Sequence, residues 1–144
     1  MSAFWRYWLV SWCAGVGIFG LIIAGGAFEA TSRPVRLVFE GLQAPDELVF
    51  TPSMRFTLGV LGAISIGWAT TMLMVLLAAF QLGDRARQIW LSLTVGLATW
   101  FIIDSSISIA TGFGLNLFPN VFLIVTYLIP VFVSGRLTPV AVRT

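Results

Sequence analysis

The sequence predicts an all-α membrane protein, in which four transmembrane helices form one bundle with a single longer loop. Of the 144 residues, 58% are hydrophobic and only 10% are charged, whereas soluble domains carry charge on about a quarter of their residues. The apolar residues also cluster into long runs, and a nearly uncharged run of about 18 residues is a candidate membrane span. We therefore expect a single transmembrane domain over 1–144, with spans at 7–28, 56–80, 89–111 and 118–133.

The first span begins with an aromatic anchor. Tryptophan and tyrosine crowd residues 1–12, and both side chains favour the headgroup level of a bilayer. A cleaved signal peptide is the rival interpretation, but the apolar region exceeds the usual length of roughly 7–15 residues and residues 25–27 form a mediocre cleavage site. We therefore expect an uncleaved helix. A stripe of small residues on this helix predicts close approach of another helix: Gly17, Gly20 and Ala24.

The polar stretch 29–55 is the only connection long enough to carry structure. Within 35–40, apolar residues are interleaved with Arg36 and Glu40. This pattern fits a short amphipathic segment lying in the membrane interface, and it also fits a small hairpin packed over the bundle. The charges of the stretch have mixed sign, which is more typical of a solvated face than of a ligand site.

The second span has a clear start signal. Thr51 offers a capping hydroxyl, and Pro52 suits the first turn of a helix. Within the span, Gly59, Ala63 and Gly67 repeat every four residues. This small-xxx-small pattern predicts that the helix packs backbone to backbone against another membrane helix.

The third span carries the most unusual residue of the chain. Asp104 is a carboxylate inside a long apolar run, where an ionisable group needs a partner, a water-filled cavity or a functional role. Ser108 shares a helix face with Asp104, and Ser105 lies on the adjacent face. A short connection at 81–88 makes this span an antiparallel neighbour of the second one.

The last span follows an uncharged loop. Asn116 and Asn120 are placed to cap the span or to reach Asp104, so we treat these five residues as one candidate intramembrane polar site: Asp104, Ser105, Ser108, Asn116 and Asn120. Pro130 lies inside the final turns and should free the backbone carbonyl of Thr126. Gly135 is expected to stop the helix.

The orientation follows from the arginines, because cytoplasmic loops carry an excess of basic residues. Four spans put two groups of arginines on opposite sides. The larger group is Arg6, Arg85, Arg87, Arg136 and Arg143, and the smaller is Arg33, Arg36 and Arg55. We therefore expect an integral protein of a bacterial inner membrane, with both termini in the cytoplasm and the long loop outside.

Several chemistries are excluded by missing residues. Histidine is absent, which removes the usual haem ligand, a common zinc ligand and the most frequent general base. Cys13 is the single cysteine, so no internal disulfide or redox pair can form. No phosphate-binding loop or nucleophile motif occurs, and the net charge of +2 does not suggest nucleic acid binding. We expect neither a metal nor a cofactor.

Three classes of function are compatible with these residues. The first is an accessory or structural subunit that contacts lipid and other membrane helices, or a second copy of itself. The second is a small transport or channel subunit in which Asp104 binds a cation or relays a proton. The third, a membrane enzyme acting on lipid or quinone, is disfavoured because a lone Asp–Ser pair makes no working catalytic unit.

Overall fold

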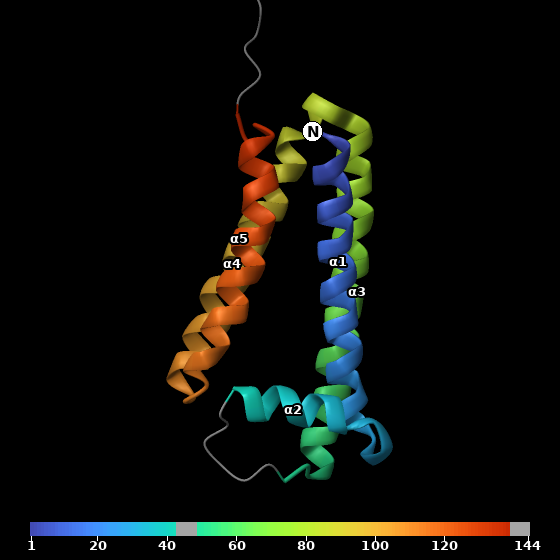
Figure 1. Cartoon of the computed structure of the whole chain (residues 1–144), viewed down its shortest axis with the longest axis vertical. Coiled ribbons are helices and arrows are strands. Elements are labelled where there is room, and N and C mark those ends of the chain that lie inside the picture. The colour runs from blue at the N-terminus through green and yellow to red at the C-terminus, as the bar shows by residue number, and fades with distance from the viewer. Residues whose placement is uncertain (43–48, 139–144) are drawn as a thin grey trace, which may run out of the picture.

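The computed structural model describes residues 1–42 and 49–138, and every regular element in these residues is helical (Figure 1). The α-helices are α1 (Ala3–Ala24), α2 (Arg33–Gly41), α3 (Pro52–Leu82), α4 (Arg87–Ala110) and α5 (Leu117–Val133). Short 3-10 turns extend or connect them: η1 (Gly25–Ala27), η2 (Glu29–Thr31), η3 (Gly83–Ala86) and η4 (Gly114–Asn116). The all-α prediction is confirmed for the described part of the chain.

Three helical segments are long and apolar enough to cross a membrane: Ala3–Ala27, Pro52–Ala110 and Gly114–Val133. The middle segment contains both α3 and α4, and η3 turns the chain back between them (Figure 1). Gly83 opens this turn with a φ of 58°, a left-handed conformation that suits a residue without a Cβ. The four apolar runs of the sequence therefore fall on four separate helices.

The helix α3 starts earlier than the predicted span because its cap lies outside the apolar run. The hydroxyl of Thr51 accepts a hydrogen bond of 3.2 Å from the backbone N–H of Met54, and Pro52 occupies the first turn. These contacts pair a backbone N–H group of the first turn well before the first long apolar stretch begins. The capping signal in the sequence thus marks the helix boundary better than hydropathy does.

Helices α1 and α3 pack side by side along most of their length (Figure 1). Glycine makes the close approach possible at two points. A Cβ on Gly20 would lie 3.0 Å from the backbone nitrogen of Ile66, and a Cβ on Gly62 would lie 2.3 Å from the backbone nitrogen of Ala24. Because the obstacle is backbone in both cases, no larger side chain fits without moving a helix.

Helix α5 is joined to α1 by tryptophan side chains. The indole N–H of Trp8 donates to the carbonyl of Thr126 at 2.9 Å, and the indole N–H of Trp12 donates to the carbonyl of Leu123 at 3.1 Å. Pro130 lies inside α5 and has no N–H to offer Thr126 four residues earlier. The carbonyl that the proline frees is therefore satisfied from the neighbouring helix, as membrane helices require.

An aromatic cluster connects the pair α1–α3 to the pair α4–α5. The ring of Trp12 lies 6.2 Å from that of Trp68 and 5.9 Å from that of Tyr127, and Trp68 lies 5.8 Å from Trp100. Aromatic pairs at such distances add to the energy of burial. Beyond this cluster, away from the N-terminus, the two helix pairs diverge (Figure 1).

Helix α2 lies across the diverging end, roughly perpendicular to the long helices (Figure 1). Val35 is fully buried in a small apolar cluster with Ile23 and Leu58. Phe39, further along α2, has its ring 6.2 Å from that of Phe113, which follows α4. The segment 33–41 is thus an amphipathic helix that contacts both helix pairs, and its location in a membrane interface stays a prediction.

Candidate functional site: a polar network in the α4–α5 hairpin

Three members of the polar network stand on the last turns of α4. Asp104 and Ser108 are four residues apart and share a face, and Ser105 lies beside them. Ser105 and Ser108 are buried, whereas Asp104 is half-buried. The hydroxyl of Ser108 donates to the backbone carbonyl of Asp104 at 2.8 Å, so its oxygen stays available as an acceptor for other donors.

The turn that follows α4 brings the last two members back to this face. Gly112 adopts a φ of 86°. The N–H of Phe113 reaches the carbonyl of Ser108 at 2.8 Å, and the N–H of Gly112 reaches the carbonyl of Ile109 at 3.3 Å. This pair of bonds is a Schellman motif, which closes a helix with a left-handed residue. It reverses the chain within a few residues, so that η4 and α5 run back along α4.

Two asparagine amides join the hairpin together. Asn116 donates to Asp104 Oδ2 at 3.0 Å and to Ser108 Oγ at 2.9 Å. Asn120 donates to the same Asp104 oxygen at 2.6 Å and to Ser105 Oγ at 3.2 Å. The structure therefore brings together all five residues of the candidate polar site, and both amide groups use their two N–H donors within the network.

One acceptor of the network is left over. Within residues 1–42 and 49–138, no hydrogen bond reaches Asp104 Oδ1. A carboxylate has about four lone-pair sites, and Oδ2 alone receives the two amides. Both asparagine amides thus use all their N–H donors inside the network, whereas Asp104 Oδ1 can still accept a hydrogen bond.

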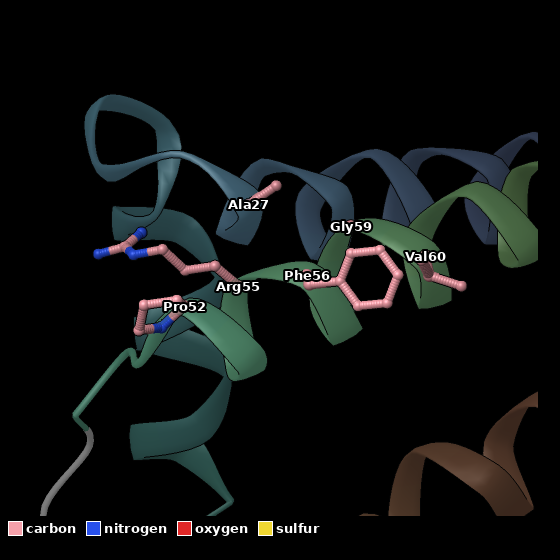
Figure 2. Close-up of a pocket in the computed structure, with 6 residues that line it drawn as sticks. All are labelled: Ala27, Pro52, Arg55, Phe56, Gly59 and Val60. Atoms are coloured by element: carbon pink, nitrogen blue, oxygen red, sulfur yellow. The ribbon is translucent and has the colours of Figure 1, made fainter.

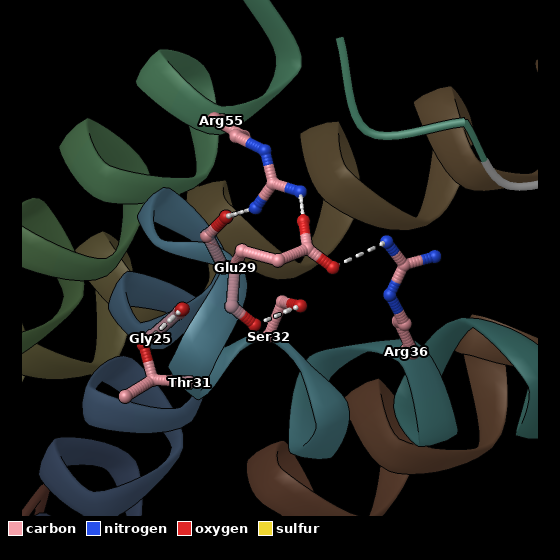
Figure 3. Close-up of polar contacts among 7 residues, drawn as sticks. Gly25, Glu29, Thr31, Ser32, Arg36 and Arg55 are labelled. Carbon is pink, nitrogen blue, oxygen red and sulfur yellow. Dashed lines mark hydrogen bonds and ion pairs between the residues drawn. The ribbon is translucent and has the colours of Figure 1, made fainter. Parts of the chain in front are cut away.

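The arginines of the long loop are not partners of Asp104. Arg55 pairs with Glu29 and also donates to the carbonyl of Gly26 at 3.4 Å, and Arg36 lies 3.8 Å from the other oxygen of Glu29 (Figure 3). The Glu29 side chain is 76% exposed, so the energy of these ion pairs is small. Their role is to join α2 and the start of α3 to the end of α1.

A surface hollow of about 420 Å³ lies beside this ion-pair cluster (Figure 2). Ala27, Phe56, Gly59 and Val60 supply its mainly apolar walls, and Arg55 lies at its rim with Pro52. The Arg55 guanidinium is already committed to Glu29 and Gly26. No polar group of the hollow is left to orient a ligand, and it has no connection to the Asp104 network.

Only some of the helix-packing residues expected from the sequence lie in a contact between helices. Gly20 and Ala24 lie in the contact with α3, and a Cβ on Gly17 would meet only the Cβ of Ala69 at 3.7 Å. On α3, a Cβ on Gly59 would lie 3.2 Å from the Cβ of Ala27, whereas a Cβ on Gly67 would meet no other atom within 4 Å, and Ala63 is exposed.

The residue that sequence reasoning missed is Gly62. Among the glycines of α1 and α3, it is the one whose Cβ would come nearest to the backbone of the facing helix. It belongs to a buried stripe spaced by three, four and seven residues: Leu58, Gly62, Ala69, Met72, Leu76 and Ala79. Heptad-like spacing of this kind marks a seam between two helices. The four-residue repeat at positions 59, 63 and 67 lies on the adjacent face of the same helix, so it did not identify the α1–α3 seam.

The single cysteine does not form a second candidate site. Cys13 is buried in the apolar core, where it acts as a small packing residue. Among the described residues, no three side chains of histidine, cysteine, aspartate or glutamate come together in a way that would hold a metal ion. The network around Asp104 is therefore the strongest candidate site inside the spans.

Comparison of the chain with protein-family models, with curated proteins and with solved structures finds no match. The site geometry consequently carries the functional argument alone.

Proposed function

We propose that this chain is an integral membrane protein with four crossings, which works as an accessory or structural subunit by binding other membrane helices. The helices α3 and α4 have 31 and 24 residues, so at about 1.5 Å per residue each exceeds a hydrocarbon core of roughly 30 Å. Because η3 turns the chain back between them, each is counted as one crossing. The arginine distribution favours a bacterial inner membrane with both termini in the cytoplasm. One arginine of that count, Arg143, lies outside the described residues.

The observation that carries this proposal is the position of Asp104 on an uncovered face. Trp100 contacts Trp68 where α4 meets α3, and Asp104 and Ile107 follow Trp100 by four and seven residues on the same face. Ile107 is 57% exposed. On α3, Ile64 precedes Trp68 by four residues and is 62% exposed. The contact face therefore continues past the aromatic cluster without a covering element from the described chain.

A polar group on such a face needs a polar neighbour. Acyl chains offer no hydrogen bond to the open oxygen of Asp104, and an unsatisfied polar group in hydrocarbon is costly. A hydroxyl or amide on a partner helix would satisfy Asp104 Oδ1 while its apolar side chains cover Ile107 and Ile64. The four amide hydrogen bonds of Asn116 and Asn120 hold α4 and α5 together and make the hairpin a firm surface for such a partner.

A second candidate function rests on the same open oxygen. In a transport or channel subunit, Asp104 Oδ1 would bind a cation or exchange a proton with water between oligomerised copies. The two functions differ in what reaches the oxygen, because one requires a protein donor and the other requires water or an ion.

Substitution of Asp104 by asparagine separates these functions. For an accessory subunit, we expect Asp104→Asn to fold and to copurify with its partners in mild detergent, since the amide preserves size and an interhelical hydrogen bond in membranes contributes only about 0.6 kcal/mol. Asp104→Leu removes the acceptor for both asparagines and should lower thermal stability. Native mass spectrometry of the purified protein identifies the partners.

Ser106→Ala is the matched control, because this exposed hydroxyl bonds only to the Ile102 carbonyl of its own helix. The proposal would be overturned if the wild-type protein purified without any partner protein and Asp104→Asn abolished a cation- or pH-dependent flux in liposomes that Ser106→Ala retained.

A further inference from the structure

A second polar site lies at the opposite end of the bundle from Asp104. There a pocket of about 230 Å³ opens where α1 begins, α3 ends, α4 begins and α5 has just ended. Its walls include Arg6, Phe80, Asp84, Trp90 and Arg136. This volume is below that of usual drug-sized pockets, roughly 300–1,000 Å³, and it suits a compact polar group. The ends of the long helices place the pocket at the headgroup level of a bilayer.

Two buried donors at this pocket have no acceptor. In the part of the chain that the structure describes, neither the indole N–H of Trp90 nor the Nε–H of Arg136 makes a hydrogen bond. Trp90 is only 1% exposed. Buried donors in proteins are almost always paired, so each unpaired one requires an explanation. Both of these donors belong to residues that line the same pocket, so an acceptor held there would lie next to them and could pair with them after a small side-chain shift.

The charges around the pocket favour an anionic acceptor. Arg6 and Arg136 contribute two guanidinium groups, against one carboxylate, Asp84. Arg136 lies 3.0 Å from that carboxylate, but the Asp84 side chain is 87% exposed and points its charge largely into solvent. Burial lowers the pKa of the α-amino group of Met1, which also lines the pocket, and the nearby Arg136 and Arg6 guanidinium groups lower it further. The field at this position is thus positive.

The aromatic walls hold the donors in place. The guanidinium of Arg6 lies over the ring of Phe80 at 5.7 Å, and this ring lies 6.0 Å from that of Trp90. Cation–π contact keeps an arginine oriented while leaving its N–H groups available. An anion in the pocket would therefore meet a fixed indole donor and two positioned guanidinium groups.

We infer that this pocket binds a phosphate group, with the Trp90 indole and Arg136 Nε donating to its oxygens and Arg6 supplying a second positive charge. Arginine suits phosphate because its planar fork matches the oxygen geometry, and basic pockets between membrane helices commonly take lipid headgroups. The phosphate could belong to an anionic phospholipid of the surrounding leaflet or to a soluble phosphate compound. This site is independent of the Asp104 network and of the function proposed for it.

The test measures binding of two probes to the full chain purified in detergent. Native mass spectrometry with added dioleoylphosphatidylglycerol, and with dioleoylphosphatidylcholine for comparison, detects a lipid ligand, whereas titration with inorganic phosphate detects a soluble one. Trp90→Phe retains the ring but removes the N–H, and Arg136→Gln removes the guanidinium. We expect each to weaken binding about tenfold, the effect of losing one hydrogen bond to a charged group. Asp84→Asn should strengthen binding.

Arg85→Gln is the matched control, because Arg85 is an exposed arginine in the same turn, next to Asp84, and does not line the pocket. Preferential retention of phosphatidylglycerol that Trp90→Phe reduces and Arg85→Gln does not supports the site with a lipid source. Equivalent results with inorganic phosphate support it with a soluble source. If Trp90→Phe binds both probes as the wild type does, or if Arg85→Gln weakens binding equally, the inference is overturned. The comparison of Trp90→Phe with Arg85→Gln remains decisive even if Arg136→Gln does not fold.

Discussion

At the scale of single residues, the structure is organised by backbone groups that lack a partner in their own helix. Pro130 removes one N–H from α5, and the carbonyl of Thr126 turns to the indole of Trp8. Gly112 ends α4 with a positive φ and thereby carries Asn116 back to Asp104. In both cases, a local defect in one helix creates the contact that fixes a second element.

The hydrogen bond between Trp8 and Thr126 should contribute measurably to the stability of the bundle. Trp8→Phe leaves the Thr126 carbonyl unpaired at a buried position, and we expect a loss of about 1 kcal/mol in stability. Pro130→Ala supplies a new N–H to the same carbonyl, so the loss caused by Trp8→Phe should largely disappear in that background. Thermal unfolding of the four proteins in detergent, treated as a double-mutant cycle, measures the coupling. Additive effects of the two substitutions would contradict this account.

At the scale of elements, the sequence predicted helices better than it predicted their contacts. Hydropathy and the Thr51–Pro52 cap located the long helices, because length and capping are local properties. The five polar residues could be grouped because they are close in sequence and share helix faces. The seam between α1 and α3 could not be assigned, because adjacent small-residue stripes on α3 look alike until the partner helix is known. That partner selects Gly62 rather than Gly67.

Two glycines of α3 give opposite predictions for the same substitution. Gly62→Leu pushes a side chain into the backbone of Ala24, and we expect it to lower the melting temperature strongly or to prevent folding, because overpacking typically costs about 1–3 kcal/mol or more. Gly67→Leu enters open space and should leave the melting temperature of the bundle nearly unchanged. Fluorescence-detected thermal unfolding in mild detergent compares the two variants. Equal sensitivity at both positions would mean that another helix covers Gly67.

At the scale of the whole molecule, two helix pairs meet at an aromatic cluster near the middle of α3 and are connected by α2 at the end where they diverge. The cluster rests on residues 12, 68, 100 and 127, which no sequence pattern relates to one another. The contact between Phe39 and Phe113 is equally nonlocal. Local sequence patterns therefore predicted the individual helices of this protein. The packing of the two helix pairs against each other depends on aromatic contacts between residues far apart in the sequence, which only the folded chain reveals.

The proposed topology predicts on which side of the membrane two positions of the chain lie. With four crossings, a reporter fused after Val133 and a reporter inserted after Leu42 should lie on opposite sides of the membrane, with the first in the cytoplasm. Paired alkaline phosphatase and fluorescent-protein fusions, which are active on opposite sides, measure this directly. A C-terminal alkaline phosphatase fusion that is active outside the membrane would contradict the orientation. Fusions on the same side at both positions would contradict the number of crossings.

The bond from Trp8 to Thr126 also sets an order of events during biosynthesis. Its two ends belong to the first and the last long helix and are 118 residues apart in the chain. While the ribosome is still adding residues, α1 already carries its indole donor, and α5 emerges after α1 to α4 with a carbonyl that Pro130 has left unpaired. A nascent chain that stops before α5 can form neither this bond nor the rings around Tyr127. The contact between α1 and α5 can therefore form only after translation has passed α5, and products truncated before α5 lack it.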